Sequence, residues 1–354
     1  MAQLQFNGIG IRALAACVPA DVSKNEDALK GVVPDDEITK TVNAIGIREK
    51  RIAKKDTCAS DLCFAAAEKL FADNPDLSRE SIDVLLFMSQ TADYRTPATA
   101  AILQHRLGLS RNCAAMDLSL ACSGYVYALS AAFAYAGNPG VKRVLLLDGE
   151  TYSKVVNPHD RVNAPLYGDA GTATLIEKSD DFGESFFVLK TDGSGENAVK
   201  IPAGGCRIPA SLQTLEAQTA ADGNIRSACE VFMNGMDVFN FAVRCAPDAV
   251  KDVAAISGTS PANADYVVFH QSNKMMTDFL AARMKIPVSK VLYSLNKYGN
   301  TSSASIPLTI SECLAGNAPG GKLILCGFGA GFSWAASVLS LAKAKISPVI
   351  DYQS

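Results

Sequence analysis

Apolar runs alternate along the chain with segments in which apolar residues recur at helical spacing. The runs SIDVLLFMSQ and KRVLLLDGETYS are typical of strands that are buried on both faces of a parallel sheet. Other segments repeat alanine, leucine and phenylalanine every three or four residues, as amphipathic helices do. Strands are predicted at 5–19, 81–90, 142–153 and 263–273, and helices at 25–44, 57–73, 97–107 and within 229–257. This alternation predicts an α/β fold.

The order of these elements occurs twice. NADYVVFHQSN parallels SIDVLLFMSQT, LYSLNKYGNTSSAS parallels MDLSLACSGYVYAL, and GKLILCGFGAGFS parallels KRVLLLDGETYS. The spacings agree as well, because Asp83 precedes Cys122 by 39 residues and Asp265 precedes Asn300 by 35. We infer two copies of one unit related by a pseudo-dyad, with right-handed crossovers.

The division between the two copies is predicted near residue 180. Residues 1–180 would form the first half. Residues 181–354 would begin with a connecting and lid-like region, rich in Gly, Ser, Asp and Thr up to about residue 230, and continue as the second half. Long connecting segments of this kind tend to be functional.

Cys122 is the predicted nucleophile. In MDLSLACSGYVYALSAAFAY a strand-like run ends at this cysteine, and Ser123 and Gly124 stand where a helix would open. Unpaired backbone N–H groups and the positive end of the helix dipole favour a thiolate, so we expect a pKa below the free value of roughly 8.5. The alternative is that Cys122, like most of the ten cysteines, is a small buried apolar residue.

His270 and Asn300 are predicted to join Cys122. His270 ends a predicted strand, and Asn300 occupies the place in the second copy that Cys122 occupies in the first. Active sites in such sheets lie where strands end and helices begin. A thiolate, an imidazole and a carboxamide suit acyl transfer through a thioester, because the two side chains can hold a developing oxyanion. The alternatives are that His270 is a histidine of the core and that Asn300 is a residue of a turn.

The segment GFGAGFSW follows the last predicted buried strand. Its glycines permit a close approach of the backbone, and we predict an oxyanion hole made by the N–H groups of Ala330 and Cys122. A dinucleotide-binding fingerprint is excluded, since only 23 residues follow Gly331. A tight turn before the final strand is the alternative.

Composition narrows the function further. With 48% hydrophobic and 19% charged residues and a net charge of -3, nothing indicates a nucleic-acid or membrane partner. No signal peptide is read at the N-terminus. The ten cysteines are irregularly spaced, which predicts a reduced cytoplasmic protein. Three histidines and no C-x-x-C offer little for a zinc site, so no metal is expected.

The ordered motifs GIREKRI, ACSGYVYAL, DR followed by YGDAGTA, MNGMDVFNFAV, HQSN, YGNTSSAS and GFGAGFSW span nearly the whole chain. This set resembles the thiolase-like condensing enzymes, most closely the β-ketoacyl-acyl carrier protein synthase III group. The resemblance implies a five-layered αβαβα fold, a homodimer and no cofactor beyond the donor. The resemblance also implies the reaction. The cysteine nucleophile would take an acyl group from an acyl-CoA or acyl-carrier-protein donor, and this group would then be condensed with malonyl-acyl carrier protein, with loss of carbon dioxide.

The resemblance also implies roles for individual residues. Cys122 would be the nucleophile, and His270 and Asn300 would bind the malonyl thioester oxygen. Arg161 matches a family arginine near the coenzyme A site. Asn273 would support the site, and Phe328 matches the phenylalanine that packs beside the cysteine.

Other positions depart from the family pattern. Lys40 and Ala44 replace the tryptophan and arginine that clamp the coenzyme A adenine, and Met236 and Met275 replace an asparagine and an arginine. Thr96 replaces a phenylalanine, which would leave room for a longer or more polar acyl chain. The middle glycine of a GGG motif is Ala330. The Ala330 change preserves the backbone N–H, whereas the losses at Lys40, Ala44, Met236 and Met275 weaken the case for acetyl-CoA as the starter.

Three other functions remain open. The acyl group could pass to a hydroxyl or amine without formation of a carbon–carbon bond. A hydroxymethylglutaryl-CoA synthase would need a carboxylate near the cysteine, for which Glu150 is a candidate. The chain could also be an inactive subunit of a heterodimeric synthase, although such subunits often lose the cysteine or the histidine.

Overall fold

A seven-stranded sheet contains most of the first half of the chain. The computed structural model describes residues 2–220, 223–316 and 321–353. The sheet has the order β17-β2-β8-β7-β5-β6, and β18 also pairs with β2. The parallel strands β5 and β7 are buried, as predicted from the sequence, whereas the parallel edge strand β6 is only partly buried and contains Asp117. The strands are β2 (Ile9–Pro19), β5 (Val84–Met88), β6 (Ala114–Leu118), β7 (Arg143–Glu150), β8 (Ala170–Lys178), β17 (Lys345–Ile346) and β18 (Ile350–Tyr352).

A five-stranded sheet contains most of the second half, in the order β1-β9-β16-β15-β14. Its strands are β1 (Ala2–Asn7), β9 (Glu184–Thr191), β14 (Tyr266–Phe269), β15 (Lys322–Gly329) and β16 (Ser333–Ser340). The termini are exchanged between the two sheets, because β1 pairs with β9 whereas β17 and β18 return to β2.

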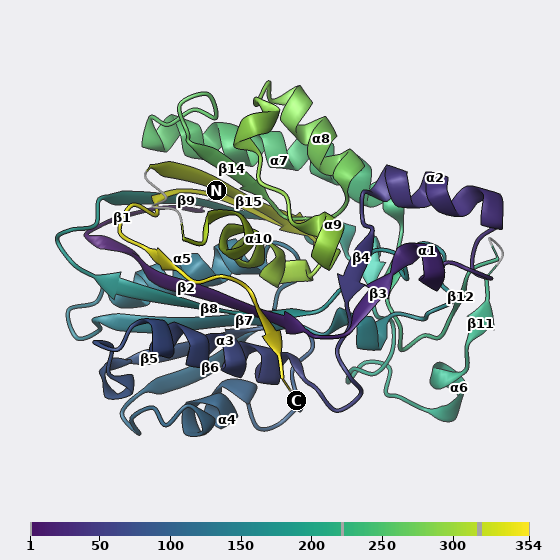
Figure 1. Ribbon diagram of the computed structural model, residues 1–354, viewed down its shortest axis with the longest axis horizontal. Coiled ribbons are helices and arrows are strands. Elements are labelled where there is room, and N and C mark those ends of the chain that lie inside the picture. The colour runs from purple at the N-terminus through teal and green to yellow at the C-terminus, as the bar shows by residue number, and fades with distance from the viewer. Residues whose placement is uncertain (1, 221–222, 317–320, 354) are drawn as a thin grey trace.

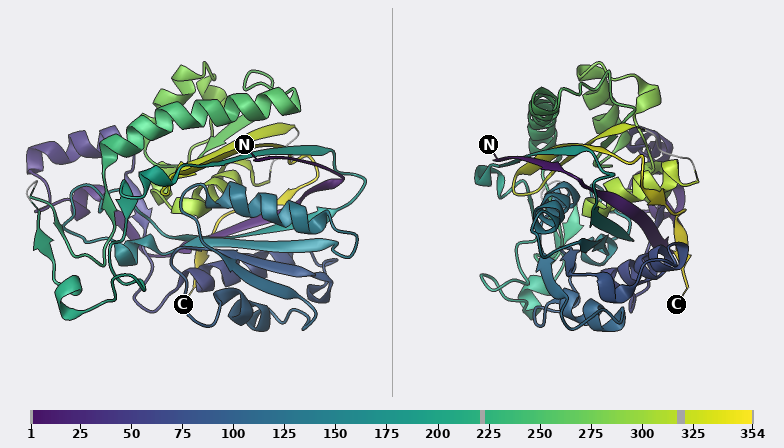
Figure 2. Two further views of the ribbon diagram at one scale, coloured as in Figure 1. Left: turned by 180° about the vertical axis from the view of Figure 1, so that it is seen from behind. Right: turned by 90° about the vertical axis from the view of Figure 1, so that its left-hand side faces the viewer.

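Helices form three layers around the two sheets (Figure 1). The helices α3 and α4 cover the outer face of the seven-stranded sheet, and α7 contacts β9, β15 and β16 on the outer face of the other. Between the sheets lie α5, which contacts β5, β7 and β15, and α10, which contacts β2, β8 and β14 (Figure 2). The predicted five-layered αβαβα fold is therefore confirmed. The bounds are α3 (Ala59–Asp73), α4 (Thr99–Arg106), α5 (Gly124–Ala136), α7 (Gly235–Ser257), α8 (Lys274–Arg283) and α10 (Ser305–Leu314).

The two sheets share one chain order of elements. The series β2-α3-β5-α4-β6-α5-β7-β8 matches β9-α7-β14-α8-α10-β15-β16, in which the place of β6 is taken by a single parallel bridge between Val267 and Val291. The match extends to one hydrogen bond. The Asp83 carboxylate accepts the Arg143 N–H at 3.0 Å, and the Asp265 carboxylate accepts the Lys322 N–H at 2.7 Å.

Three predicted segments differ in the structure. The helix predicted at 25–44 is two helices, α1 (Asn25–Ala28) and α2 (Asp35–Ile45), because Gly31 at φ 75° and Pro34 stand between them. The strand before Cys122 ends earlier, at Leu118. The region 181–230, predicted as a connection throughout, contains β9, a central strand whose residues Phe187 and Val188 are fully buried.

Several short elements lie outside the layers. They include β3 (Val22–Lys24), β4 (Glu49–Arg51), β10 (Val199–Lys200), α6 (Leu212–Leu215), β11 (Gln218–Thr219), β12 (Ile225–Arg226), β13 (Phe232–Met233) and α9 (Leu295–Tyr298). Of these, β3, β4, α6, β11 and β12 gather at the right of Figure 1. Three buried apolar clusters fill the spaces between the five layers, and the central cluster joins α5 and α10 to both sheets. Among the described residues, no helix is both long and apolar enough to cross a membrane.

Candidate active site

Cys122 lies just before α5, in the loop between β6 and that helix. The sequence placed it correctly at the start of the helix, but the expected low pKa is wrong. Burial, with a smaller contribution from the charge of Glu150, raises the pKa of Cys122 to about 12. Loss of hydration therefore outweighs the helix terminus, and Cys122 rests as a thiol.

Ser302 is the residue at which the predicted site residues meet. The Cys122 Sγ atom lies 3.9 Å from the Ser302 Oγ atom. The Ser302 backbone N–H donates to Asn300 Oδ1 at 2.9 Å. The φ of Ser302 is +51°, a conformation that residues other than glycine rarely adopt. This bond orients the carboxamide of Asn300, and we find no acceptor among the described residues for its two Nδ2 protons.

His270 joins the same group from the end of β14. The Ser302 backbone is a hydrogen-bond partner of its imidazole, and the ring packs edge-on against Phe328 with 5.7 Å between centroids. His270 Nδ1 lies 2.8 Å from Ser305 Oγ, which also accepts the Gln271 N–H at 3.3 Å. The Ser305 hydroxyl proton is thus available to Nδ1, an arrangement that favours the tautomer with its proton on Nε2. Burial lowers the pKa of His270 to about 3.

The turn from β15 to β16 closes on the cysteine. A Cβ atom added at Gly329 would lie 2.6 Å from the Cys122 Cβ atom, so only glycine fits there. Ala330 follows directly and lines a cavity of about 280 Å³ together with Gln90, Ser119 and Tyr152. The predicted donors of the oxyanion hole, the N–H groups of Cys122 and Ala330, belong to segments in contact.

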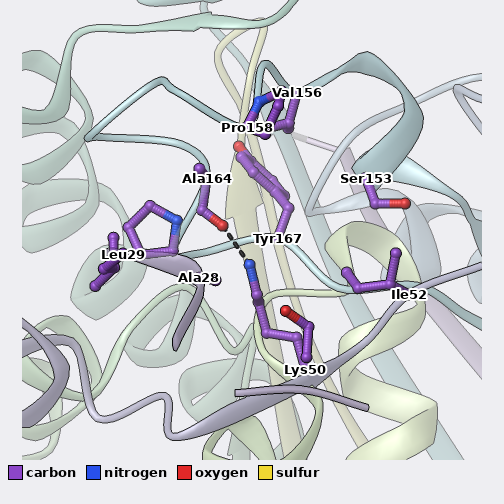
Figure 3. A pocket seen from close by; sticks show the side chains of 11 residues that line it. Ala28, Leu29, Lys50, Ile52, Ser153, Val156, Pro158, Ala164 and Tyr167 are labelled. Atoms are coloured by element: carbon purple, nitrogen blue, oxygen red, sulfur yellow. Dashed lines mark hydrogen bonds between the residues drawn. The ribbon is translucent and has the colours of Figure 1, made fainter. Parts of the chain in front are cut away.

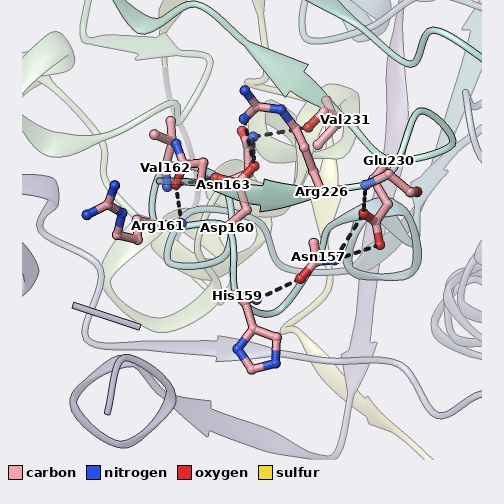
Figure 4. Close-up of polar contacts among 11 residues, drawn as sticks. Asn157, His159, Asp160, Arg161, Val162, Asn163, Arg226, Glu230 and Val231 are labelled. Carbon is pink, nitrogen blue, oxygen red and sulfur yellow. Dashed lines mark hydrogen bonds and ion pairs between the residues drawn. The ribbon is translucent and has the colours of Figure 1, made fainter. Parts of the chain in front are cut away.

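Arg161 lies on an exposed turn whose neighbours are held by hydrogen bonds (Figure 4). The buried carboxylate of Asp160 accepts the Val162 N–H at 2.8 Å and pairs with Arg226 at 3.3 Å. The Arg161 backbone N–H donates to Asn224 at 3.0 Å, while its guanidinium is directed away from the Asp160 group. The hydrogen bond and the ion pair therefore hold this turn against residues 224–231.

The other two predicted binding residues are less directly connected to Cys122. Asn273 caps α8, because its Oδ1 accepts the Met276 N–H at 2.8 Å. Thr96 is exposed, and its hydroxyl bonds the Arg95 carbonyl at 2.9 Å. Among the described residues, no cluster of His, Cys, Asp and Glu has the form of a metal site.

Comparisons with known proteins show the family to which the chain belongs. Residues 255–341 match the family described as 3-Oxoacyl-[acyl-carrier-protein (ACP)] synthase III C terminal, and residues 116–193 match 3-Oxoacyl-[acyl-carrier-protein (ACP)] synthase III. The β-ketoacyl-[acyl-carrier-protein] synthase III of Caldanaerobacter subterraneus subsp. tengcongensis is 35% identical over 337 residues, which cover 94% of this chain and 98% of the relative. The chain belongs to the 3-oxoacyl-[acyl-carrier-protein] synthase III family. It is a condensing enzyme of this type.

Further relatives extend the likeness over almost the full length. The protein of the same name from Symbiobacterium thermophilum is 37% identical over 339 residues, covering 95% of this chain and 99% of the relative. A crystal structure of the 3-oxoacyl-(acyl-carrier protein) synthase from Burkholderia xenovorans LB400 is 36% identical and superposes with a TM-score of 0.92, covering 99% of both chains. The five-layered fold is thus that of solved synthases.

This synthase also has a buried acidic pair, of which the sequence indicated Glu150 as a carboxylate near the cysteine but not Asp148. Asp148 and Glu150 lie at the end of β7, and both accept from the Ser303 hydroxyl, at 2.5 and 3.3 Å. Burial raises the pKa of Glu150 to about 7 and holds that of Asp148 well above its ordinary value. Two acids at alternate positions of an otherwise apolar strand were the signal, because alternate residues share one face.

Four of the positions that depart from the family pattern are exposed. Lys40 and Ala44 lie on the exposed face of α2, while Met236 and Met275 expose 67% and 58% of their surface at the starts of α7 and α8. The synthase thus presents two methionines where the resemblance would place polar and basic side chains.

Proposed function

We propose that this synthase loads an acyl group on Cys122 and condenses it with malonyl-acyl carrier protein to give a 3-oxoacyl product. The meeting of one thiol, one neutral imidazole and one oriented carboxamide at Ser302 is the observation that carries this proposal. A thiol supplies the covalent step, and the two neutral polar groups supply hydrogen bonds to a second thioester.

Loading begins with the Cys122 sulfur at the carbonyl carbon of the donor thioester. The new carbon–sulfur bond forms as the bond to the donor sulfur breaks, and the Cys122 proton leaves with the departing thiol. The backbone N–H groups of Cys122 and Ala330 stabilise the intermediate oxyanion. The positive end of α5 favours the same charge.

Condensation uses the second half of the site. Asn300 Nδ2 and His270 Nε2 donate to the malonyl thioester oxygen, which becomes negative as carbon dioxide leaves. The resulting carbanion attacks the acyl carbon on Cys122, and the thiolate departs. The low pKa of His270 keeps the imidazole neutral throughout, so it acts as a hydrogen-bond donor and not as a cation.

The proposed carriers of the malonyl and acyl groups follow from the family and from the positions at which this chain departs from the family pattern. Acyl carrier protein is the proposed carrier of the malonyl group. We leave the donor as an acyl-CoA or an acyl-carrier protein, since exposed Lys40 and Ala44 offer no aromatic face for an adenine. Arg161 and Thr96 are proposed to contact the donor and its acyl chain, while Phe328 and Asn273 support His270 and its neighbouring helix.

The assembly is proposed to be a homodimer. Among the strands that the structure describes, β6 pairs with β5 alone, so its outer backbone groups are available to a second copy. Pairing of β6 with β6 about a two-fold axis would continue the seven-stranded sheet. We also propose that residue 180 divides the halves, since it falls between β8 and β9, and that the ten free cysteines belong in the reducing cytoplasm.

Intact-mass spectrometry combined with carbon dioxide release tests the proposal. Mixing with acyl-CoAs and acyl-carrier proteins should add one acyl mass to the synthase, and malonyl-acyl carrier protein should then remove it with one equivalent of carbon dioxide. Removal of the acyl group by an alcohol or amine without carbon dioxide release would contradict condensation.

A further inference from the structure

A second cavity has a volume of about 390 Å³ and is distinct from the cavity that Ala330 lines (Figure 3). This size is within the range of small-molecule sites. Its rim includes the exposed residues Ala28 and Pro158, so it is open to solvent. Inside, Leu29, Ile52 and Val156 provide apolar walls. The proposed reaction uses none of these residues.

Lys50 is the one charged residue among those that line this cavity in the described part of the chain. It is only 5% exposed. Its ammonium donates to the Ala164 carbonyl, and no other described residue accepts either of its two remaining protons. Asp169, the acid whose charge acts on Lys50, already accepts from the Ala53 N–H at 2.7 Å and the Ser153 N–H at 3.0 Å. Burial lowers the pKa of Lys50 to about 8, because its charge lacks a partner.

Tyr167 connects this cavity to the wall of the cavity that Ala330 lines. Its ring lines the Lys50 cavity and stacks on Tyr152, which lines the Ala330 cavity, with 4.9 Å between centroids. No described residue bonds the Tyr167 hydroxyl, which lies at the upper end of the cavity in Figure 3. Tyr167 is also bridged to Asn300, since the Asn300 N–H donates to the Leu166 carbonyl at 2.8 Å.

Lys50 reaches the same catalytic segment. Its Cγ atom lies 3.0 Å from where a Cβ atom of Gly299 would be, directly before Asn300. Lys50 and Tyr167 therefore both contact the segment that positions the Asn300 carboxamide.

We propose that this cavity binds a small monocarboxylate with an apolar body, whose carboxylate pairs with Lys50. The occupant contacts Tyr167 and Lys50 and so shifts the position of Asn300. This effect on turnover, but not the binding itself, rests on the proposed function.

The charge and the walls of the cavity determine this class of ligand. One ammonium neutralises one negative charge, whereas a dianionic phosphate would leave a negative charge among apolar walls close to Asp169. A neutral ligand would leave the ammonium unpaired. The apolar walls stabilise a hydrocarbon body, and the Tyr167 hydroxyl can donate to the second carboxylate oxygen.

Octanoate is the test ligand, with octanol as its neutral analogue and octyl phosphate as its dianionic one. Binding is measured by calorimetry on the full chain and on three variants. Lys50→Met removes the ammonium, Ala28→Phe narrows the rim while leaving the charge, and Lys24→Met removes a neighbouring exposed lysine as a control. Octanoate should bind the wild type and Lys24→Met equally, and should bind Lys50→Met and Ala28→Phe at least about tenfold more weakly. Octanol and octyl phosphate should bind the wild type at least about tenfold more weakly than octanoate.

Kinetics then separate this inference from the proposed function. Octanoate should change the rate of the malonyl-dependent step in the wild type without competing with acyl loading of Cys122. Equal binding to the wild type, Lys50→Met and Ala28→Phe would overturn the site, as would competition between octanoate and the acyl donor. Tighter binding of octyl phosphate would overturn the carboxylate assignment. If octanoate binds as expected while no condensation occurs, the proposed function fails and the site stands.

Discussion

The ends of β7 and β15 occupy matching places in the two halves, yet they carry different residues. Asp148 and Glu150 on β7 match Gly327 and Gly329 on β15. The glycines allow the backbone to approach Cys122 and Ser123, and the acids bond to Ser303 at the start of the opposite segment. Each strand end thus contacts the other half. One end fits closely around the nucleophile, and the other holds the segment that follows Asn300.

This difference shows how the two halves of a duplicated fold supply different groups for one reaction. The half with the acids supplies the sulfur, whose ionisation burial and Glu150 oppose. The half with the glycines supplies His270 and Asn300, which are neutral hydrogen-bond donors. The covalent step and the stabilisation of the second thioester therefore depend on different halves.

Replacing Cys122 by alanine should have the largest effect, because it removes the one group that forms a covalent bond. Acyl loading should fall by roughly 10³-fold or more, as measured by intact mass. Cys206→Ala is the control, since Cys206 is an exposed cysteine. Retained loading by Cys122→Ala would show that the first half does not supply the nucleophile.

Asn300→Ala tests the other half. Loss of one oxyanion donor should slow the malonyl-dependent step by about 10² to 10³-fold, while acyl loading stays near the wild-type rate. Pre-loaded protein and malonyl-acyl carrier protein in a single-turnover assay separate the two steps. Parallel loss of both steps would mean that Asn300 supports the fold of the site and does not act on the second thioester.

Gly329→Ala tests the close approach on β15. The added Cβ atom would lie 2.6 Å from the Cys122 Cβ atom, so the nucleophile or the turn must shift. We expect a loss of about 1–3 kcal/mol in the free energy of unfolding, together with slower loading. Gly140→Ala is the matched control, because nothing lies within 4 Å of its added Cβ atom. If Gly329→Ala has the stability and the loading rate of the wild type, the close approach at Gly329 is not required.

Glu150→Gln changes the matching position on β7 and should have the smallest effect. Without the carboxylate, the pKa of Cys122 should fall, and iodoacetamide should alkylate it about threefold to tenfold faster at pH 8. Glu184→Gln, which changes an exposed acid, should leave this rate unchanged. Slower alkylation in Glu150→Gln would reverse the sign of the proposed charge effect.

The stability of the same variant has a defined pH dependence. Glu150 has a raised folded pKa of about 7 against an ordinary 4.5, so the unfolded state releases its proton first as the pH rises. Glu150 therefore lowers the stability of the wild type progressively between these two values. Denaturant titrations should show that this part of the pH dependence disappears in Glu150→Gln.

Much of the fold and the catalytic trio could be predicted from the sequence. Buried parallel strands are continuous apolar runs, and the second copy repeats the first, so Cys122, His270 and Asn300 could be placed at matching strand ends. The strand β9 was missed because the apolar stretch FFVL lies within a polar region whose composition indicates a loop. The break between α1 and α2 depends on Gly31 and Pro34, which lie inside an otherwise helical pattern.

The details of the site depend on contacts that sequence patterns do not contain. The pKa of Cys122 was expected to fall because the start of the helix was visible, whereas the burial that raises it is a property of the packed halves. Ser302 reads as one of several serines in a turn, and only its left-handed backbone places it between Cys122 and Asn300. The Lys50 cavity likewise combines segments more than a hundred residues apart.

A two-step mass measurement on His270→Ala tests most directly whether the two halves supply separate steps of the reaction. The variant is first mixed with the acyl donor and then with malonyl-acyl carrier protein, beside the wild type and Cys122→Ala. We predict that His270→Ala gains the acyl mass like the wild type but keeps it when malonyl-acyl carrier protein is added. A His270→Ala variant that unloads at the wild-type rate, or that cannot load at all although folded, would contradict the account.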